Sequence, residues 1–369
     1  MKIGIDARLY GSGFGLARYV RELVDGLVQD KENEYVFFLR KENFDLVPTP
    51  SRGKKVLADI PWYSFAEQLK MGRIIDQEKL DLVHCPHWNV PLLSRSPLVM
   101  TIHDLIMFHF PRPEATTLGP VRFWLKDQAH RFILQQAARR ARRIITTSEF
   151  TKQDLLAHLR LNPEKITVLY QAPFTSVVDP VVSSRVKEKV GERPYGLYVG
   201  ACYPHKNVDA LLRAWSLVRE KTAEKYQLVL VGPDNYFSQR LRSGVEYHSL
   251  GEGVKFLGPV SDAELVTLYQ GARLFVYPSL YEGFGLPPLE AMAHNLPVVC
   301  SNASCLPEVV GEAALYFDPS NEIQMAEVII RGLEDEDRRW QLQEAGKENL
   351  GRFSQEKFRQ QTKEVYRSI

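Results

Sequence analysis

The most informative segment of the sequence, residues 277–292, reads YPSLYEGFGLPPLEAM. We expect a buried strand to end at Pro278 and a glycine-containing loop to follow it. Pro287 and Pro288 then open a helix, since proline is well tolerated in a first helical turn. Backbone N–H groups at a helix start lack intrahelical partners and face the positive end of the helix dipole, so they suit a phosphate. The segment therefore predicts a strand–loop–helix unit with an anion-binding end.

Two carboxylates accompany this unit. Glu282 lies on the loop and Glu290 in the first turns of the helix, so the two can reach opposite ends of one elongated ligand. Carboxylates accept hydrogen bonds from vicinal hydroxyl groups, which both a ribose and a hexose provide. Either residue alone would fit an ordinary helix N-terminus, where the dipole favours an acid. The combined segment favours a ligand.

Apolar runs of strand length alternate with segments of helical period on both sides of this unit, which predicts βαβ units and parallel sheets. The strands expected in the first half are Lys2–Asp6, Tyr35–Leu39, Lys54–Ala58, Leu80–Cys85, Leu98–His103, Arg143–Thr147 and Ile166–Tyr170. Those expected in the second half are Gly196–Val199, Gln227–Val231, Val254–Leu257, Leu274–Tyr277, Val298–Cys300 and Ala314–Phe317.

A proline-containing stretch separates the two halves. We expect an N-terminal domain over 1–175, a linker over 176–194 and a C-terminal domain over 195–352, with a final helix over about 353–369 that packs back on the first domain. The fold class is α/β, with two Rossmann-like, doubly wound parallel-sheet domains facing each other across a cleft. Ligands of such sheets bind at the carboxyl ends of the strands.

Composition is that of a globular protein: 369 residues, 44% hydrophobic and 25% charged, with a net charge of +2. The four cysteines form no Cys-x-x-Cys pair, which argues against a disulfide framework or a zinc knuckle. No apolar run approaches the roughly 18 residues of a transmembrane helix, and the N-terminus reads as a strand rather than a signal peptide. We therefore expect a cytoplasmic protein without a nucleic-acid partner.

The segment around Glu282 and Glu290 strongly resembles that of retaining glycosyltransferase family 4, which has the GT-B fold. Residues 297–302, 306–309 and 316–319 match the same family, and their sequence is similar to that of bacterial mannosyltransferases. The resemblance implies that Glu282 contacts the donor sugar and that Glu290 holds the nucleotide ribose. It also implies a donor-binding role for the residues that join the two, which are Gly283, Phe284, Gly285 and Leu286.

A second phosphate-binding element is expected at residues 198–207, where a strand ends and a helix follows. A lysine at a helix N-terminus is electrostatically unfavourable unless an anion is bound there. The resemblance places Lys206 on the donor diphosphate. The family usually has an arginine before this lysine and sometimes a basic residue after the glycine, whereas this chain has His205 and Ala201. We expect Lys206 and backbone amides to hold the diphosphate, with help from His205.

The glycine-rich loop of residues 10–18 does not match the G-x-G-x-x-G dinucleotide fingerprint, because position 16 is leucine. This mismatch disfavours an oxidoreductase. The resemblance places Gly13 and Gly15 in the cleft near the donor phosphate and the acceptor, although a tight turn alone would also explain them.

Polar residues also follow two strands of the first half. His103 and Asp104 resemble the His-Asp motif of the family, which faces the donor sugar and the acceptor hydroxyl. His87, Trp88 and Asn89 resemble an acceptor-side loop, in which Trp88 either stacks on a sugar face or only packs. We assign catalytic roles to four residues, which are His103, Asp104, Lys206 and Glu282.

We expect transfer of a hexose, with mannose from GDP-mannose as the best guess, to a glycan or lipid-linked acceptor with retention of configuration. No metal or other cofactor is expected, because the nearest match to a metal-binding Asp-x-Asp loop is a solvated charge run at 334–337. A basic segment at 122–143 is either a solvated helix face or a contact with the inner face of the membrane. Two alternatives stay open: a sugar-nucleotide epimerase of the same fold, or a non-catalytic nucleotide-sugar-binding protein.

Overall fold

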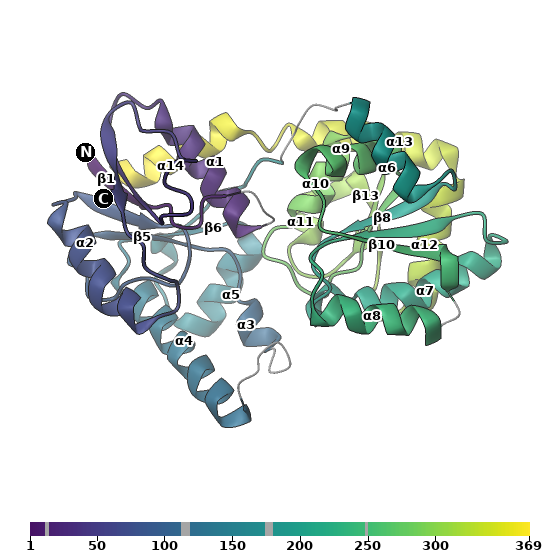
Figure 1. The fold of residues 1–369 in the computed structure, drawn as a ribbon, viewed down its shortest axis with the longest axis horizontal. Helices are drawn as coiled ribbons and strands as arrows, with labels where there is room; N and C mark the ends of the chain where they lie inside the picture. Colours follow the sequence, from purple (N-terminus) through teal and green to yellow (C-terminus); the bar gives the residue numbers. More distant parts are fainter. Residues whose placement is uncertain (12–14, 112–118, 174–179, 248–249) are drawn as a thin grey trace. The chain divides into compact units, whose positions relative to one another are not determined.

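The computed structural model describes residues 1–11, 15–111, 119–173, 180–247 and 250–369. Contacts divide the chain into two compact units (Figure 1). The first unit comprises Met1–Met107, Pro111–Gln171 and Gln355–Ile369, and the second comprises Phe108–Phe110 and Ala172–Ser354. Each unit contains one parallel sheet, and each is described by itself.

The first sheet has the strand order β3-β2-β1-β4-β5-β6-β7. Its strands are β1 (Lys2–Asp6), β2 (Glu34–Leu39), β3 (Gly53–Leu57), β4 (Leu82–Cys85), β5 (Leu98–Ile102), β6 (Arg143–Thr146) and β7 (Ile166–Val168). The direction of winding reverses between β1 and β4. Loops that leave the carboxyl ends of these two strands therefore diverge and leave room for a ligand. Gly4 permits close packing inside β1, because a Cβ atom there would lie 2.4 Å from Leu80.

Helices fill the connections of this sheet. They are α1 (Leu16–Val28), the π-helix η1 (Glu67–Met71), α2 (Gly72–Gln77), α3 (Ile106–His109), α4 (Pro120–Arg140), α5 (Glu149–Leu159), the 3₁₀ turn η3 (Pro163–Lys165) and the C-terminal α14 (Gln355–Arg367). The last helix packs on α1 within the first unit. Its Phe358 lies 5.5 Å from the ring of Tyr19, and both belong to the core that covers β1.

The second sheet has the strand order β10-β9-β8-β11-β12-β13. Its strands are β8 (Tyr195–Val199), β9 (Gln227–Val231), β10 (Val254–Gly258), β11 (Leu274–Tyr277), β12 (Val298–Ser301) and β13 (Ala314–Phe317). The strands β8, β9, β11 and β12 are buried on both faces, as their continuous apolar sequences predict, whereas the edge strand β10 is only partly buried. The winding of this sheet reverses between β8 and β11, which again makes that point the expected ligand site.

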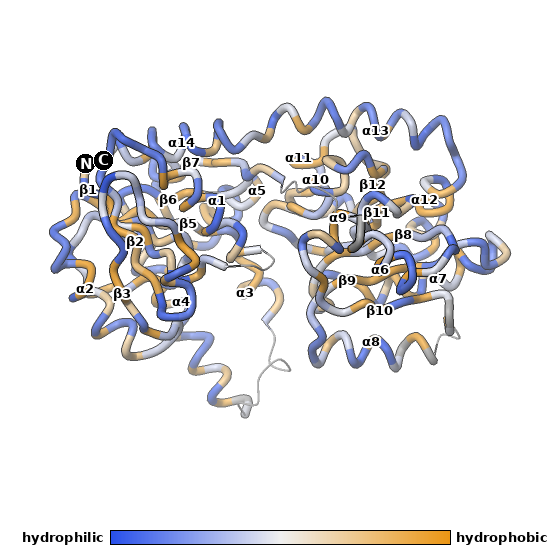
Figure 2. Tube along the Cα trace, turned by 45° about the horizontal axis from the view of Figure 1, so that its top comes forward, coloured by the Kyte–Doolittle hydropathy of each residue, from blue (hydrophilic) through white to orange (hydrophobic). Residues whose placement is uncertain are grey.

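The helices of the second unit are α6 (Pro180–Val190), η4 (Pro204–Lys206), α7 (Val208–Lys221), α8 (Tyr236–Tyr247), η5 (Gly251–Gly253), α9 (Asp262–Gly271), α10 (Leu286–Ala293), α11 (Leu306–Val310), η6 (Gly311–Ala313), α12 (Glu322–Glu334) and α13 (Glu336–Leu350). In Figure 1, α9 and α10 lie on one side of this sheet, whereas α7 and α8 lie on the other. Hydrophobic residues follow the strands of both sheets, and α13 is largely hydrophilic (Figure 2). The α/β, doubly wound class expected from the sequence is confirmed.

Every strand expected from the sequence is present, with small shifts at some ends. We expected a linker over 176–194, but most of this stretch forms α6, which is a helix of the second unit. The prolines of this stretch suggested irregular structure. Pro180 instead begins the helix, at a position where its missing N–H has no helical partner to lose.

Candidate active site

The switch point of the second sheet brings Lys206 and Glu282 together. Lys206 lies in η4, which follows β8, and Glu282 lies in the loop that follows the neighbouring strand β11. The Lys206 ammonium donates to both carboxylate oxygens of Glu282, at 2.6 and 2.8 Å. It also donates to the hydroxyl of Tyr277, the last residue of β11, at 3.1 Å. These three side chains form a charged cluster at the carboxyl end of the sheet.

Glu282 and Tyr277 are buried and Lys206 is partly buried, and the electrostatics of the cluster follow from that. Glu282 is 6% exposed. Burial by itself would raise the pKa of this carboxyl, but the charges of Lys206 and His205 and the hydrogen bonds of the site bring the pKa below its usual value. Burial, with the nearby Glu282 charge, raises the pKa of the Tyr277 hydroxyl well above its ordinary value. The site therefore holds an ion pair beside a neutral phenol at neutral pH.

Backbone contacts fix the loop between β11 and α10. The N–H of Leu280 donates to the carbonyl oxygen of His205 at 2.8 Å, and the N–H of Glu282 donates to the Ser304 hydroxyl at 3.0 Å. Gly285 precedes α10 with a φ of 100°, a conformation that favours glycine. A Cβ atom at Gly285 would also lie 2.9 Å from Leu306. Glycine is thus needed here for both its backbone angle and its size.

The remaining residues of this loop lie where the sequence predicted them. Gly283 and Phe284 complete the turn, and α10 begins at Leu286. Phe284 is buried, and its ring meets that of Phe353 edge to face at 5.8 Å. The Phe284 carbonyl accepts from the Cys305 thiol at 3.0 Å. The side chain of Phe284 therefore supports the loop from inside.

Glu290 lies on α10 with a different partner. Its side chain is 2% exposed, and its Oε2 accepts from the Tyr269 hydroxyl at 3.0 Å. The Tyr269 ring stacks on His294 at 5.6 Å. Burial lowers the pKa of His294, so this imidazole is neutral at neutral pH. A carboxylate has two acceptor oxygens, so Glu290 can in chemical terms accept from hydroxyl groups of a ligand as well as from Tyr269.

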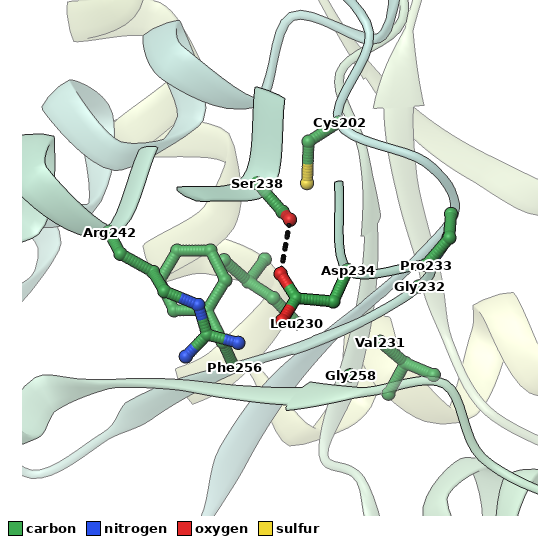
Figure 3. Close-up of a pocket in the computed structure, with 10 residues that line it drawn as sticks. All are labelled: Cys202, Leu230, Val231, Gly232, Pro233, Asp234, Ser238, Arg242, Phe256 and Gly258. Carbon is green, nitrogen blue, oxygen red and sulfur yellow. Dashed lines mark hydrogen bonds between the residues drawn. The ribbon is translucent and has the colours of Figure 1, made fainter. Parts of the chain in front are cut away.

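A shallow hollow lies beside the carboxyl ends of β9 and β10 (Figure 3). Its lining residues are Cys202, Leu230, Val231, Gly232, Pro233, Asp234, Ser238, Arg242, Phe256 and Gly258. Ser238 donates to the Asp234 carboxylate at 2.9 Å, and the Arg242 guanidinium lies 4.8 Å from the centre of the Phe256 ring. The hollow thus combines an apolar wall with a carboxylate and a cation.

His103 follows β5 in the first unit, and its ring nitrogen Nε2 lies 3.0 Å from the carbonyl oxygen of Pro86. Burial lowers the pKa of His103 to about 4, although the bond to Pro86 opposes this shift. The neutral ring therefore carries its proton on Nε2, and Nδ1 is the basic nitrogen. Next to it, Oδ1 of Asp104 accepts the N–H of Ile106 at 2.9 Å, which starts α3.

The acceptor-side loop follows β4. The N–H of Asn89 donates to Nδ1 of His87 at 3.2 Å, and the Asn89 amide donates to the buried carboxylate of Glu67. Arg8 is 1% exposed and pairs with both Glu67, at 2.6 Å, and Asp6, at 2.7 Å. The loop is thus attached to a buried ion-pair network that connects it to the end of β1.

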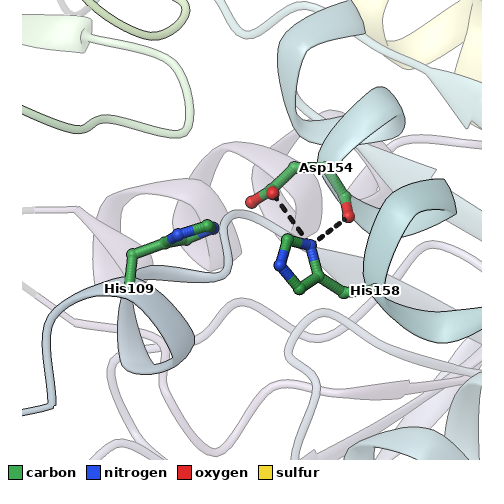
Figure 4. A group of neighbouring side chains, drawn as sticks. All are labelled: His109, Asp154 and His158. Atoms are coloured by element: carbon green, nitrogen blue, oxygen red, sulfur yellow. Dashed lines mark hydrogen bonds and ion pairs between the residues drawn. The ribbon is translucent and has the colours of Figure 1, made fainter.

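Of the two glycines assigned to the first loop, Gly15 directly precedes α1 with a φ of 66°. Gly13 lies outside the described residues. Elsewhere in the first unit, Asp154 and His158 lie one turn apart on α5, as Figure 4 shows. Nδ1 of His158 is 2.9 Å from the Asp154 carbonyl oxygen and 3.1 Å from its carboxylate, which is a local contact within one helix. His109, the other side chain drawn there, belongs to the second unit.

Sequence reasoning missed Tyr277, Tyr269 and the network of Arg8 and Glu67. Tyr277 ends a predicted strand next to the loop, and that position was the available signal. Tyr269 and Glu67 lie on helices, far along the chain from Glu290 and Asn89, so only the topology brings them together.

Two family models match the chain, one for each unit. The model described as Glycosyltransferase Family 4 matches residues 15–172, and the model described as Glycosyl transferases group 1 matches residues 182–349. The chain is 31% identical over 376 residues to O-antigen chain mannosyltransferase B of Escherichia coli, covering 96% of each chain. The chain therefore belongs to glycosyltransferase family 4, and it is a glycosyltransferase.

A second relative agrees with this assignment, and a solved structure shows the fold. O-antigen chain mannosyltransferase RfbU of Salmonella typhimurium is 30% identical over 333 residues, which cover 86% of each chain. Sucrose-phosphate synthase from Thermosynechococcus elongatus superposes with a TM-score of 0.78 at 21% identity, over 100% of this chain and 98% of the other. The GT-B fold is thereby confirmed. Within the described part of the chain, no helix is long and apolar enough to cross a membrane.

Proposed function

We propose that this glycosyltransferase moves a mannosyl residue from GDP-mannose to a hydroxyl group of a growing glycan, with retention and without a metal ion. Two of the relatives are O-antigen chain mannosyltransferases, which supports mannose as the transferred sugar and a glycan as the acceptor. The observation that carries the donor site is the cluster of Lys206, Glu282 and Tyr277 at the switch point of the second sheet.

In this proposal the second unit binds the donor. Lys206 and the N-terminal amides of α10 hold the diphosphate, with His205 beside them. Glu290 accepts from the ribose hydroxyls, and Glu282 accepts from a hydroxyl of the donor sugar. The hollow beside β9 and β10 takes the base, whose polar edge faces Asp234.

Transfer follows a front-side route. The bond between the anomeric carbon and the phosphate oxygen breaks, and the acceptor oxygen bonds to that carbon on the same face. The acceptor proton passes to the departing phosphate, whose charge Lys206 stabilises. Glu282 is engaged by Lys206 and is buried, which favours this route over one in which Glu282 acts as a nucleophile.

The first unit presents the acceptor. His103 and Asp104 bind the reacting sugars, and the loop of His87, Trp88 and Asn89 holds the acceptor glycan. For a lipid-linked acceptor, we propose that α4 rests on the membrane surface. One face of this helix exposes Trp124, Leu125 and Phe132 among basic residues.

A panel of sugar nucleotides tests the donor and the metal together. Purified protein is incubated with GDP-mannose, UDP-glucose and UDP-N-acetylglucosamine and a mannose-terminated glycan, in excess EDTA, while nucleotide release and product are measured. We expect GDP release with glycan extension from GDP-mannose only. Release that stops with EDTA and returns with Mg²⁺ or Mn²⁺ would contradict the metal-free route, and a changed sugar without extension would indicate an epimerase.

A further inference from the structure

Four aromatic side chains gather on the first unit from three separate segments. Tyr63 precedes η1, His87 and Trp88 follow β4, and His130 lies on α4. Tyr63 is 5.6 Å from Trp88 and 5.4 Å from His130, and Trp88 is 5.0 Å from His87 and 5.4 Å from His130, between ring centres. We call these four residues the aromatic platform.

The aromatic platform is open to solvent, unlike a core cluster. Tyr63 is 49% exposed, and the other three rings are half-buried. Rings that served packing alone would gain most by full burial, since each square ångström of apolar surface removed from water contributes about 25 cal/mol. The exposure of Tyr63 is therefore more consistent with a surface that contacts a ligand.

Tyr63 has a strained backbone conformation. Its φ is 58°, in the left-handed region that a bulky residue rarely adopts, and such a conformation typically costs about 1–3 kcal/mol. Oε2 of Glu67 accepts the N–H of Tyr63 at 2.8 Å and also accepts the side-chain amide of Asn89. Glu67 is fully buried and paired with Arg8. One fixed carboxylate thus positions both sides of the platform.

The polar edges of the platform are uncharged. Burial lowers the pKa of His87 to about 3, with smaller contributions from the neighbouring His103 and His130. Burial and the charge of Lys126 lower the pKa of His130 as well. Nδ1 of His87 accepts from Asn89, so the proton is on Nε2, which lies 3.4 Å from the Tyr63 hydroxyl. The two imidazole rings of the platform are therefore neutral at neutral pH.

We propose that the aromatic platform binds a pyranose ring of the acceptor glycan, with Tyr63 and Trp88 as its stacking surfaces. A pyranose has an apolar face of C–H groups and a rim of hydroxyls. The apolar face suits aromatic rings, and the rim suits the Tyr63 hydroxyl at the edge of the platform. This inference rests on the proposed function, because it takes the substrate of the first unit to be a glycan.

Two variants and one control test the proposal. Tyr63→Gly removes the ring and also relieves the left-handed backbone, so the protein should stay folded. Trp88→Leu removes the second stacking surface. Trp340→Leu is the control, because Trp340 is 65% exposed on α13 of the other unit. Affinity for α-linked mannotriose is measured by NMR titration without any sugar nucleotide, and melting temperatures are recorded for all proteins.

We expect Tyr63→Gly and Trp88→Leu each to weaken mannotriose binding by about tenfold or more, equivalent to about 1.4 kcal/mol, while Trp340→Leu binds like wild type. GDP affinity should be unchanged in all three. Equal mannotriose affinities in folded variants, or no binding by the wild type at millimolar concentrations, would overturn the platform. Variants that lose binding to anionic vesicles but still bind mannotriose like wild type would also contradict the proposal. Failure of every sugar nucleotide to support transfer, with ring-dependent mannotriose binding intact, would reject the proposed function and leave the platform standing.

Discussion

We expect the ion pair between Lys206 and Glu282 to govern how the proposed donor site responds to an anion. A lone lysine at this depth would be an unpaired buried charge, which is costly, and Glu282 compensates it at 2.6 Å. An incoming diphosphate offers the ammonium a second acceptor at the same place. In the proposed mechanism, the Glu282 carboxylate is then released to accept a hydroxyl of the donor sugar. The pair thus keeps both side chains in position before the substrate binds.

Replacing Lys206 by alanine should lower kcat/KM for the sugar nucleotide by tens- to hundreds-fold. The lost contact is a charge-assisted one, worth about 1.5–3 kcal/mol. Steady-state kinetics measure this, and a melting curve shows whether the unpaired Glu282 destabilises the fold. Lys189→Ala is the matched control, because Lys189 forms an exposed ion pair with Glu264 in the same unit. Wild-type kinetics in the Lys206 variant would make Lys206 a structural residue only.

At the scale of elements, two loops each follow a strand at the switch point of its own sheet, and each is held by hydrogen bonds to other segments of its unit. The loop after β11 is shaped by Gly285 and by hydrogen bonds from Leu280 and Glu282. The loop after β4 is attached to Glu67, which lies in a π-helix. Short π-helices often mark functional positions, because they turn a side chain out of helical register. Both loops are therefore fixed by the elements on either side of them.

Gly285→Ala should destabilise the second unit by about 2 kcal/mol or more, since alanine meets both an unfavourable φ and a clash with Leu306. Gly251→Ala provides the comparison. Its φ is 44° and nothing lies within 4 Å of an added Cβ, so only backbone strain of about 1 kcal/mol is expected. Urea unfolding gives both values. Equal losses of unfolding free energy in the two variants would show that Leu306 moves aside without a measurable penalty.

At the scale of the whole molecule, the sequence predicted the strands of both sheets, because parallel strands buried on both faces are continuous apolar runs. It also located Glu282, Glu290 and Lys206, each next to a strand end or a helix start. It did not predict α6, whose prolines resemble a linker. Nor did it predict the partners Tyr269 and Glu67, since contacts between distant segments depend on the topology rather than on local pattern.

Charge and exposed apolar groups on α4 lead to a prediction about membranes. The wild-type protein should sediment with vesicles that contain anionic phospholipid and not with neutral vesicles. Replacing Trp124 and Phe132, which are 59% and 58% exposed, by serine should reduce that binding several-fold without lowering the melting temperature. Vesicle sedimentation with a salt series measures both. Equal binding by wild type and variant would show that this face is only solvated.

The central claim is that Glu290 holds the nucleotide and Glu282 the sugar of one donor, and calorimetric titration with GDP tests it most directly. Glu290→Gln should bind GDP about 5- to 30-fold more weakly than wild type, because a neutral amide replaces a charged acceptor of the ribose hydroxyls, at about 1–2 kcal/mol. Glu282→Gln should bind GDP as well as wild type or better, because Lys206 loses its competing partner, yet turn over GDP-mannose more slowly. Equal GDP affinities and equal rates in both variants would contradict the site assignment, and the opposite pattern would mean that the two glutamates have exchanged roles.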